Sequence, residues 1–280
     1  MDESLTGLMS MSCYAYAGLP HNVVKLRLQT QGGDRVYRYK GVTDALVRIV
    51  KEEGIRGLGK GGTPNLACCL LSNPVENAVD GVSKNAVATL QLRKVERDDG
   101  MTLQAALEAS FISIFVSTVS TVFENITSKL QFQRQPLAQR DYRGPLDCIS
   151  KVFKREGMTG LFRGYSSVLL RDVPATPIFI GLYHAISPIR ERTMGPETLF
   201  TPIVTATFAT AASLAILYPA DVVKAHMQTA SNPLTLRDGF RLVFAHHGLR
   251  GFYRGGAAAA ISGGMSIAAF AITVGIVSNR

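Results

Sequence analysis

One sequence block occurs three times in this chain, at regular intervals. In each copy a glycine follows an acidic residue or a histidine, and seven residues later a second glycine follows a Lys or Arg. An aspartate lies nine residues before each copy (Asp44, Asp147, Asp238), and the blocks themselves are Glu53–Gly61, Glu156–Gly164 and His247–Gly255. This agreement predicts three equivalent units, which we place at 1–97, 98–194 and 195–280.

A second shared element precedes each block. The third unit reads Pro219-x-Asp221-x-x-Lys224-x-His226-x-Gln228, and the first reads Pro20-x-Asn22-x-x-Lys25-x-Arg27-x-Gln29. The second unit has lost the proline but keeps the register, with Glu124, Thr127, Lys129 and Gln131. Proline lacks an N–H and clashes with the preceding helical turn, so we expect helix kinks at Pro20 and Pro219.

Apolar stretches recur with the same regularity. Each is long enough to cross the ~30 Å hydrocarbon core of a bilayer as a helix, and they cover 4–20, 62–82, 103–124, 164–187, 198–219 and 256–277. Charged residues make up 18% of the chain, fewer than a soluble domain of this length usually carries. Polar side chains inside the stretches must face one another or a watery cavity. A soluble bundle explains these segments poorly, so we expect an all-α membrane protein.

The charge pattern excludes other classes of function. The net charge is +9, but the Lys and Arg residues lie in short loops without aromatic interleaving, so we expect no nucleic-acid partner. The four cysteines have neither metal-ligand spacing nor a paired framework. There is no nucleophile–base set and no phosphate-cradling loop. We therefore expect no enzyme activity, no cofactor and no metal. The N-terminal MDESLTGLMS resembles no cleavable targeting segment, so targeting is expected to be internal.

The two shared elements together resemble the signature of the mitochondrial carrier family. That signature is Pro-x-Asp/Glu-x-x-Lys/Arg at the end of odd-numbered spans, then Glu-Gly-x-x-Gly and Lys/Arg-Gly before even-numbered ones, and the match covers essentially the whole chain. The resemblance implies six tilted transmembrane helices and three short surface helices in pseudo-threefold symmetry around one central cavity. The surface helices would be 42–51, 145–154 and 236–245, where apolar positions recur every three to four residues.

The resemblance also implies surroundings and partners. It implies a monomer in a lipid bilayer, with anionic lipid such as cardiolipin around it, and a small molecule as substrate. The location would be the mitochondrial inner membrane, with the peroxisomal membrane as the alternative.

In the family, charges of the proline element form a gate on the matrix side, the acid of one unit pairing with the base of the next. The pairs here would be Glu124–Lys224, Asp221–Lys25 and Asn22–Thr127. Both members of the third pair are uncharged, so neither leaves an unpaired ion in a dry gate, and Asn and Thr can hydrogen-bond. We expect two ionic links and one neutral link. Simple decay of a duplicated motif is the alternative.

The family's gate on the cytoplasmic side lies near the ends of even-numbered helices. Of the aromatic, acidic and basic positions that build it, only Lys84 and Tyr183 match here. We expect this gate to be weak, which supports the alternative of a non-transporting scaffold or regulator.

Substrate contacts in the family lie about two turns into the even-numbered helices. Adjacent Arg171 and Asp172 suit a zwitterion, the guanidinium for a carboxylate and the carboxylate for an amine, and an internal ion pair is the alternative. The run Arg-Asp-Val-Pro resembles carnitine/acylcarnitine and basic amino-acid carriers. Ser262 stands where carriers of anions usually keep Arg, and the matching face of the second span carries Cys68, Ser72 and Glu76.

These candidate residues carry a net charge of −1, from Glu76, Arg171 and Asp172. A negative cavity disfavours nucleotides, phosphate and di- or tricarboxylates. We expect an alternating-access transporter for carnitine, acylcarnitine or a basic amino acid.

Overall fold

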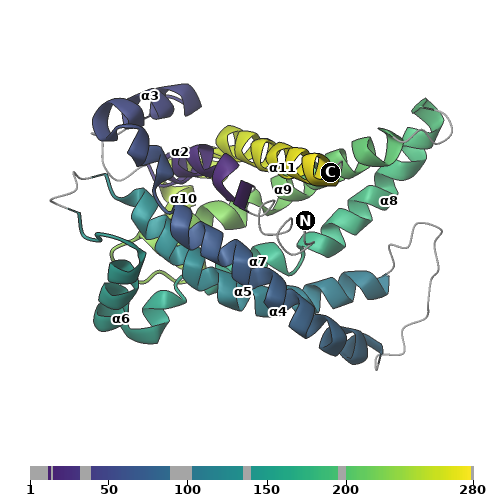
Figure 1. Ribbon diagram of the computed structural model, residues 1–280, viewed down its shortest axis with the longest axis horizontal. Coiled ribbons are helices and arrows are strands. Elements are labelled where there is room, and N and C mark those ends of the chain that lie inside the picture. The colour runs from purple at the N-terminus through teal and green to yellow at the C-terminus, as the bar shows by residue number, and fades with distance from the viewer. Residues whose placement is uncertain are drawn as a thin grey trace. The chain divides into compact units, whose positions relative to one another are not determined.

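The protein is described from a computed structural model, which defines residues 12–13, 15–31, 39–88, 103–134, 140–194 and 200–278. All secondary structure in these ranges is helical (Figure 1). The chain divides into two compact units. Unit 1 comprises Met1–Asn73, Thr118–Tyr165 and Val222–Arg280, and unit 2 comprises Pro74–Ser117 and Ser166–Asp221. The boundaries expected between the three repeats, near 97 and 194, lie at or beyond the edges of the described ranges.

The long helices begin close to where the apolar stretches begin. They are α4 (Gly62–Ala88), α5 (Leu103–Phe132), α9 (Phe200–Thr229) and α11 (Gly256–Ser278), with α7 (Tyr165–Asp172) and α8 (Ala175–Met194) covering the fourth stretch. By length and composition, two helices within the described residues are able to cross a membrane, at Gln104–Phe132 and Thr207–Thr229. Most of the first expected span, 4–20, lies outside the described residues.

The two prolines expected to kink helices occupy different positions. Pro20 lies in the first turn of α2 (Leu19–Gln29), where the missing N–H leaves no hydrogen bond unmade. Pro219 lies inside α9, which continues to Thr229. Both α5 and α9 extend beyond the expected ends, to Phe132 and Thr229. Helix α5 contains no proline, and in α9 the one hydrogen bond missing at Pro219 does not end a helix that packs along its length.

Three amphipathic helices in unit 1 begin at the expected residues. They are α3 (Val42–Glu53), α6 (Pro145–Leu161) and α10 (Leu236–Gly251). Gly54, Gly157 and Gly248 adopt φ of 73°, 68° and 59°, a left-handed conformation that a side chain disfavours. These glycines therefore turn the chain at the same point of each sequence block.

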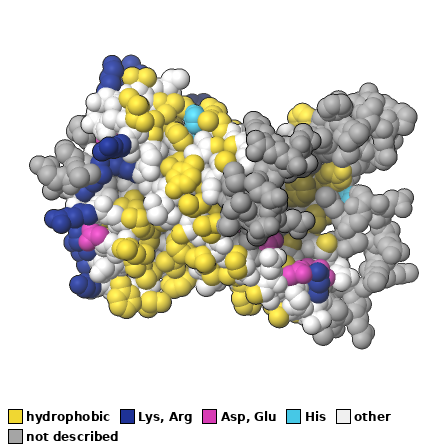
Figure 2. Space-filling view, viewed as in Figure 1, with side chains coloured by type: hydrophobic (Ala, Val, Ile, Leu, Met, Phe, Trp, Pro, Cys, Tyr) yellow, Lys and Arg dark blue, Asp and Glu magenta, His cyan; other side chains and the backbone are white. Residues whose placement is uncertain are grey.

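The core of unit 1 holds the surface helices against the long ones. Val23 and Val24 of α2 pack with Ile49 of α3 in one buried cluster, and Ile126 of α5 packs with Val152 of α6 in another. Lys and Arg side chains gather at the end of unit 1 that carries α3 and α6 (Figure 2).

In unit 2, large apolar side chains point outward from α5 and α9: Ile114, Phe115, Phe208, Leu214 and Ile216. Exposed apolar side chains in such number are expected of helices that face lipid.

Candidate functional site

Arg171 is the centre of a three-ion cluster in unit 2. Its Nε and Nη2 donate to the two carboxylate oxygens of Asp172, at 2.6 and 3.2 Å. Its Nη1 donates to Oδ1 of Asp221 on α9 at 3.1 Å. The side chains of Arg171 and Asp172 are 23% and 26% exposed, and that of Asp221 is 8% exposed. One cation meets two carboxylates, so the cluster carries a net charge of −1.

The local fold explains why these charges converge. Helix α7 ends at Asp172, and α8 starts only at Ala175, because Pro174 cannot continue the hydrogen-bond pattern. The carbonyl group of Val173 at this break accepts a hydrogen bond from Ser110 of α5 at 3.0 Å. Ser117 of α5 donates to Oδ2 of Asp172 at 2.9 Å. The break therefore presents Arg171 and Asp172 together, and neighbouring hydroxyl groups orient them.

The structure also brings together the first expected gate pair, in unit 1. Nζ of Lys224 on α9 donates to Oε2 of Glu124 on α5 at 3.2 Å. Both side chains are partly exposed, at 12% and 26%. Their role as a gate stays a prediction. The pair expected between Asp221 and Lys25 joins residues of different units, and it too stays a prediction. Within unit 2, Asp221 forms an ion pair with Arg171, a contact that the gate scheme did not include.

The neutral link expected between Asn22 and Thr127 is absent from the described residues. Oγ1 of Thr127 is buried without a hydrogen-bond partner. Oδ1 of Asn22 instead faces the hydroxyl group of Ser262 on α11, at 2.7 Å. Ser262 is buried and also lies 2.9 Å from the carbonyl oxygen of Gly18. Ser262, expected to face substrate, therefore connects α11 to α2. The two helices come this close because Gly18 has no side chain: an added Cβ would lie 2.6 Å from the Ser262 hydroxyl oxygen.

The candidate residues on α4 are divided between the two units. Cys68 and Ser72, in unit 1, are half-buried, and the Ser72 hydroxyl group donates to the carbonyl oxygen of Cys68 at 2.8 Å. Glu76, in unit 2, is exposed. Their contact with substrate stays a prediction.

Lys84 and Tyr183, the residues expected to form the second gate, both lie in unit 2. Nζ of Lys84 forms an ion pair with Asp80 of the same helix at 2.6 Å, and both side chains are exposed. The Tyr183 ring packs near Phe179 and His184, with ring centroids 6.1 Å away in each case. Lys84 thus has a partner one turn away on α4, and its role as a gate stays a prediction.

Sequence reasoning missed a set of clusters of titratable side chains in unit 1, which we call joints. Each joint combines the residue seven positions after the proline position with two residues of the repeated block. The first joint contains Arg27, Glu53 and Lys60, the second Lys129, Glu156 and Arg163, and the third His226, His247 and Arg254. The signal was present, since these positions carry titratable side chains in all three copies.

The first joint is buried and fully hydrogen-bonded. Glu53 forms ion pairs with both Arg27 and Lys60, and the three side chains are at most 8% exposed. Arg27 also donates from Nε and Nη2 to the carbonyl oxygens of Gln131 and Gln133, each at 3.2 Å. Burial alone would raise the pKa of Glu53, but hydrogen bonds from Arg27 and Lys60 outweigh it and lower that pKa below its ordinary value.

The third joint has no carboxylate among its three members. Nη1 of Arg254 donates to the carbonyl oxygen of Gln31 at 2.9 Å, and Nε2 of His247 lies 3.1 Å from the same oxygen. His247 occupies the position of Glu53, and the carbonyl oxygen of Gln31 accepts the hydrogen bond from Arg254 in this joint.

Comparison with known proteins agrees with the repeats. The model of the family described as mitochondrial carrier protein matches residues 1–87, 100–191 and 195–278. The mitochondrial basic amino acids transporter of Bos taurus is 32% identical over 217 residues, covering 75% of this chain and 67% of that protein.

Two further relatives match over most of their length. The mitochondrial arginine transporter BAC1 of Arabidopsis thaliana is 28% identical over 269 residues, 90% of this chain and 85% of the relative. The mitochondrial carnitine/acylcarnitine carrier protein of Mus musculus is 28% identical over 278 residues, 90% and 84% of the two chains. A family match across three segments that span nearly the whole sequence shows that this chain belongs to the mitochondrial carrier family and is a transporter rather than an enzyme.

Proposed function

We propose that this carrier moves a small cationic or zwitterionic metabolite, of the class of arginine, lysine or carnitine, across the mitochondrial inner membrane. The observation that carries the proposal is the pairing of Arg171 with both Asp172 and Asp221. The relatives named for arginine, basic amino acids and carnitine all take substrates that carry a positive charge, which supports the same class.

The charge of the cluster decides between substrate classes. An incoming ammonium group meets two carboxylates, those of Asp172 and Asp221, which both contact the guanidinium group of Arg171. A substrate carboxylate can bind Arg171 by replacing Asp172. The Nε–H and Nη2–H groups of a guanidinium group donate to either carboxylate in the same geometry. The displaced Asp172 is then available to the amine of the same molecule. A zwitterion therefore exchanges one ion pair for two.

A dianion cannot form a second ion pair in this way. Its second carboxylate would lie near Asp172 or Asp221 without a cation of its own, and two like charges ~4 Å apart repel by about 4 kcal/mol at an effective dielectric constant of ~20. That penalty corresponds to roughly three orders of magnitude in affinity. Malate and nucleotides are therefore disfavoured.

The test is uptake by the full-length protein reconstituted in liposomes. We expect faster uptake of arginine, lysine or carnitine than of malate or ADP. Asp172→Asn is expected to reduce the favoured uptake at least about tenfold, since it removes a charge-assisted contact. Asp238→Asn makes the same chemical change at an exposed aspartate on the surface helix α10 and is the matched control. Faster uptake of malate or ADP would refute the proposal.

A further inference from the structure

The three joints differ in one contact that the repeat predicts for all of them. At the first joint, Nζ of Lys60 donates to the carbonyl oxygen of Gln133 at 2.6 Å. At the third, Arg254 makes the equivalent bond to Gln31. The same register pairs Arg163 of the second joint with the carbonyl oxygen of Ala230. That bond is not formed: among the described residues, Nε and Nη2 of Arg163 are buried and have no hydrogen-bond partner.

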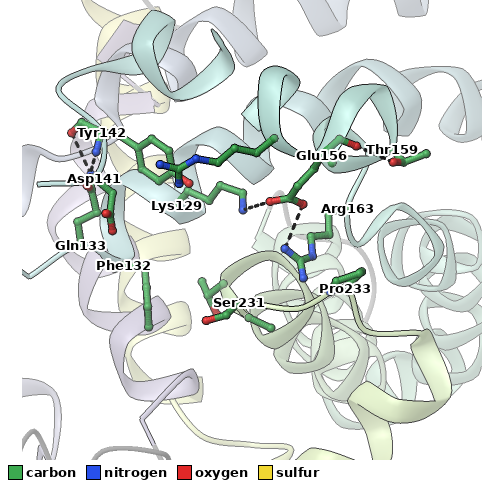
Figure 3. A pocket seen from close by; sticks show the side chains of 14 residues that line it. Lys129, Phe132, Gln133, Asp141, Tyr142, Glu156, Thr159, Arg163, Ser231 and Pro233 are labelled. Atoms are coloured by element: carbon green, nitrogen blue, oxygen red, sulfur yellow. Dashed lines mark hydrogen bonds and ion pairs between the residues drawn. The ribbon is translucent and has the colours of Figure 1, made fainter. Parts of the chain in front are cut away.

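A cavity of about 700 Å³ occupies the place of the missing contact. Lys129, Glu156 and Arg163 line it from the second repeat, and Ala230 and Ser231 line it from the third. Figure 3 shows Lys129 and Arg163 approaching Glu156 from different elements, with Ser231 and Pro233 drawn below them.

The free edge of Arg163 is the edge that recognises oxyanions. Nε–H and Nη2–H of a guanidinium group point the same way and match the two oxygens of a carboxylate or phosphate. Arg171 uses this edge on Asp172, and Arg27 uses it on two carbonyl oxygens. In Arg163, Nη1 is engaged by Glu156 at 3.2 Å, which fixes the group and leaves the side-on edge to the cavity.

Burial and charge both favour an anion there. The side chains of Arg163 and Lys129 are 5% and 8% exposed, and buried donors without partners are costly. The charged residues of the lining are Lys129, Arg155 and Arg163 against Asp141 and Glu156, a net charge of +1. Nζ of Lys129 lies 3.8 Å from Glu156, which leaves this ammonium group outside hydrogen-bonding distance of that carboxylate.

We propose that the second joint is a binding site for a small oxyanion, a carboxylate or phosphate group held by the Nε–Nη2 edge of Arg163 with Lys129 beside it. The site belongs to unit 1, whereas the Arg171 cluster belongs to unit 2, and the two sites share no residue. A bound oxyanion supplies the acceptor that the Gln133 carbonyl group supplies to Lys60, and it links residues of the second and third repeats.

The test measures thermal unfolding of the full-length protein in nanodiscs of phosphatidylcholine, with inorganic phosphate or malonate titrated at constant ionic strength. We expect a saturable rise in the unfolding temperature, because a ligand of the folded state stabilises it. Arg163→Lys keeps the positive charge that faces Glu156 but loses the parallel Nε–H and Nη2–H donors. It is expected to weaken the apparent affinity for the oxyanion about tenfold or more. Arg250→Lys, at an exposed arginine of α10, is expected to leave the affinity unchanged.

A second arm distinguishes soluble anions from lipid headgroups. Nanodiscs that contain phosphatidic acid offer the same phosphate chemistry from the bilayer, without a soluble ligand. A response that depends on Arg163 in either arm supports the site and identifies the source of the oxyanion. Equal stabilisation by chloride, or an unchanged affinity in Arg163→Lys, overturns the proposal. Equilibrium dialysis of the unmodified protein with radiolabelled phosphate decides the matter even where the variant fails to fold, since no saturable binding also overturns it.

Discussion

Two ion clusters in this protein have opposite stoichiometry. In the first joint, Arg27 and Lys60 share one carboxylate, Glu53, and all three side chains are nearly inaccessible. In the Arg171 cluster of unit 2, Asp172 and Asp221 share one guanidinium group. The surplus positive charge of the joint faces the carbonyl oxygens of Gln131 and Gln133, whereas Arg171 and Asp172 remain about one quarter exposed.

The difference separates an ion cluster that holds the fold from one that is suited to a ligand. A buried cluster is stable only when every charge and donor is satisfied, and the joint meets that condition within the protein. The Arg171 cluster retains an excess carboxylate and partial access to solvent, so a ligand can exchange with one of its members. The following changes test this distinction.

The largest effect is expected from Glu53→Gln. This change leaves Arg27 and Lys60 buried without their carboxylate, and breaking a buried ion pair in this way costs about 3–5 kcal/mol of folding free energy. Thermal unfolding in detergent measures the loss. Asp44→Asn removes a carboxylate from the partly exposed Asp44–Arg48 pair of the same surface helix and is expected to have a far smaller effect. Equal losses in the two variants would mean that the joint is not a structural cluster.

A smaller effect, on transport, is expected at the pair of Glu124 and Lys224. Each single alanine substitution is expected to slow uptake, and reversing both charges, Glu124→Lys with Lys224→Glu, is expected to recover part of it. The coupling in such a double-mutant cycle is about 0.5–3 kcal/mol for residues in contact. Initial uptake rates in liposomes provide the four corners of the cycle, and additive effects would show that the pair does not act as a gate.

The smallest expected effect is a pH dependence of the free energy of unfolding, which arises from Glu53 in the first joint. The pKa of Glu53 is lower in the folded state than its ordinary value, so its stabilisation is fully present above the ordinary pKa and is lost as the pH falls through the folded one. Below the ordinary pKa of about 4.3, the free energy of unfolding is expected to fall by up to about 1.4 kcal/mol per pH unit from this group.

Glu53→Gln is the control for this pH dependence, because it lacks the titrating group while other carboxylates, including Asp44 and Asp147, remain. The difference between the two acid unfolding curves isolates the contribution of Glu53. Parallel curves for the unmodified protein and the variant would contradict the assignment.

The helices of this fold were predictable because the repeat and the apolar periodicity act locally. The starts of α3, α6 and α10 follow from the aspartate and glycine spacing of each block, and those of α4 and α11 from the glycine that ends it. The far ends of α5 and α9 were not predictable from the same signal, since α5 has no proline at the corresponding position and α9 continues through Pro219.

The candidate site was predictable in its members but not in its pairings. The adjacent charges of Arg171 and Asp172 can be recognised in the sequence alone. The contact of Asp221 with Arg171 depends on how α9 packs in unit 2. Ser262 was expected to face substrate, whereas close packing at Gly18 turns it to the backbone of the first repeat. A repeat alignment shows which positions correspond, but not what each side chain contacts.

The central claim is that the Arg171 cluster selects substrates by charge, and a matched pair of substrates tests it most directly. Arginine and agmatine differ only in the carboxylate, and uptake of both is measured in liposomes that hold the unmodified protein or Arg171→Ala. The account predicts that Arg171→Ala lowers arginine uptake at least about tenfold, through loss of the guanidinium–carboxylate contact, and spares agmatine uptake, which needs only Asp172 and Asp221. An equal loss for both substrates would contradict it.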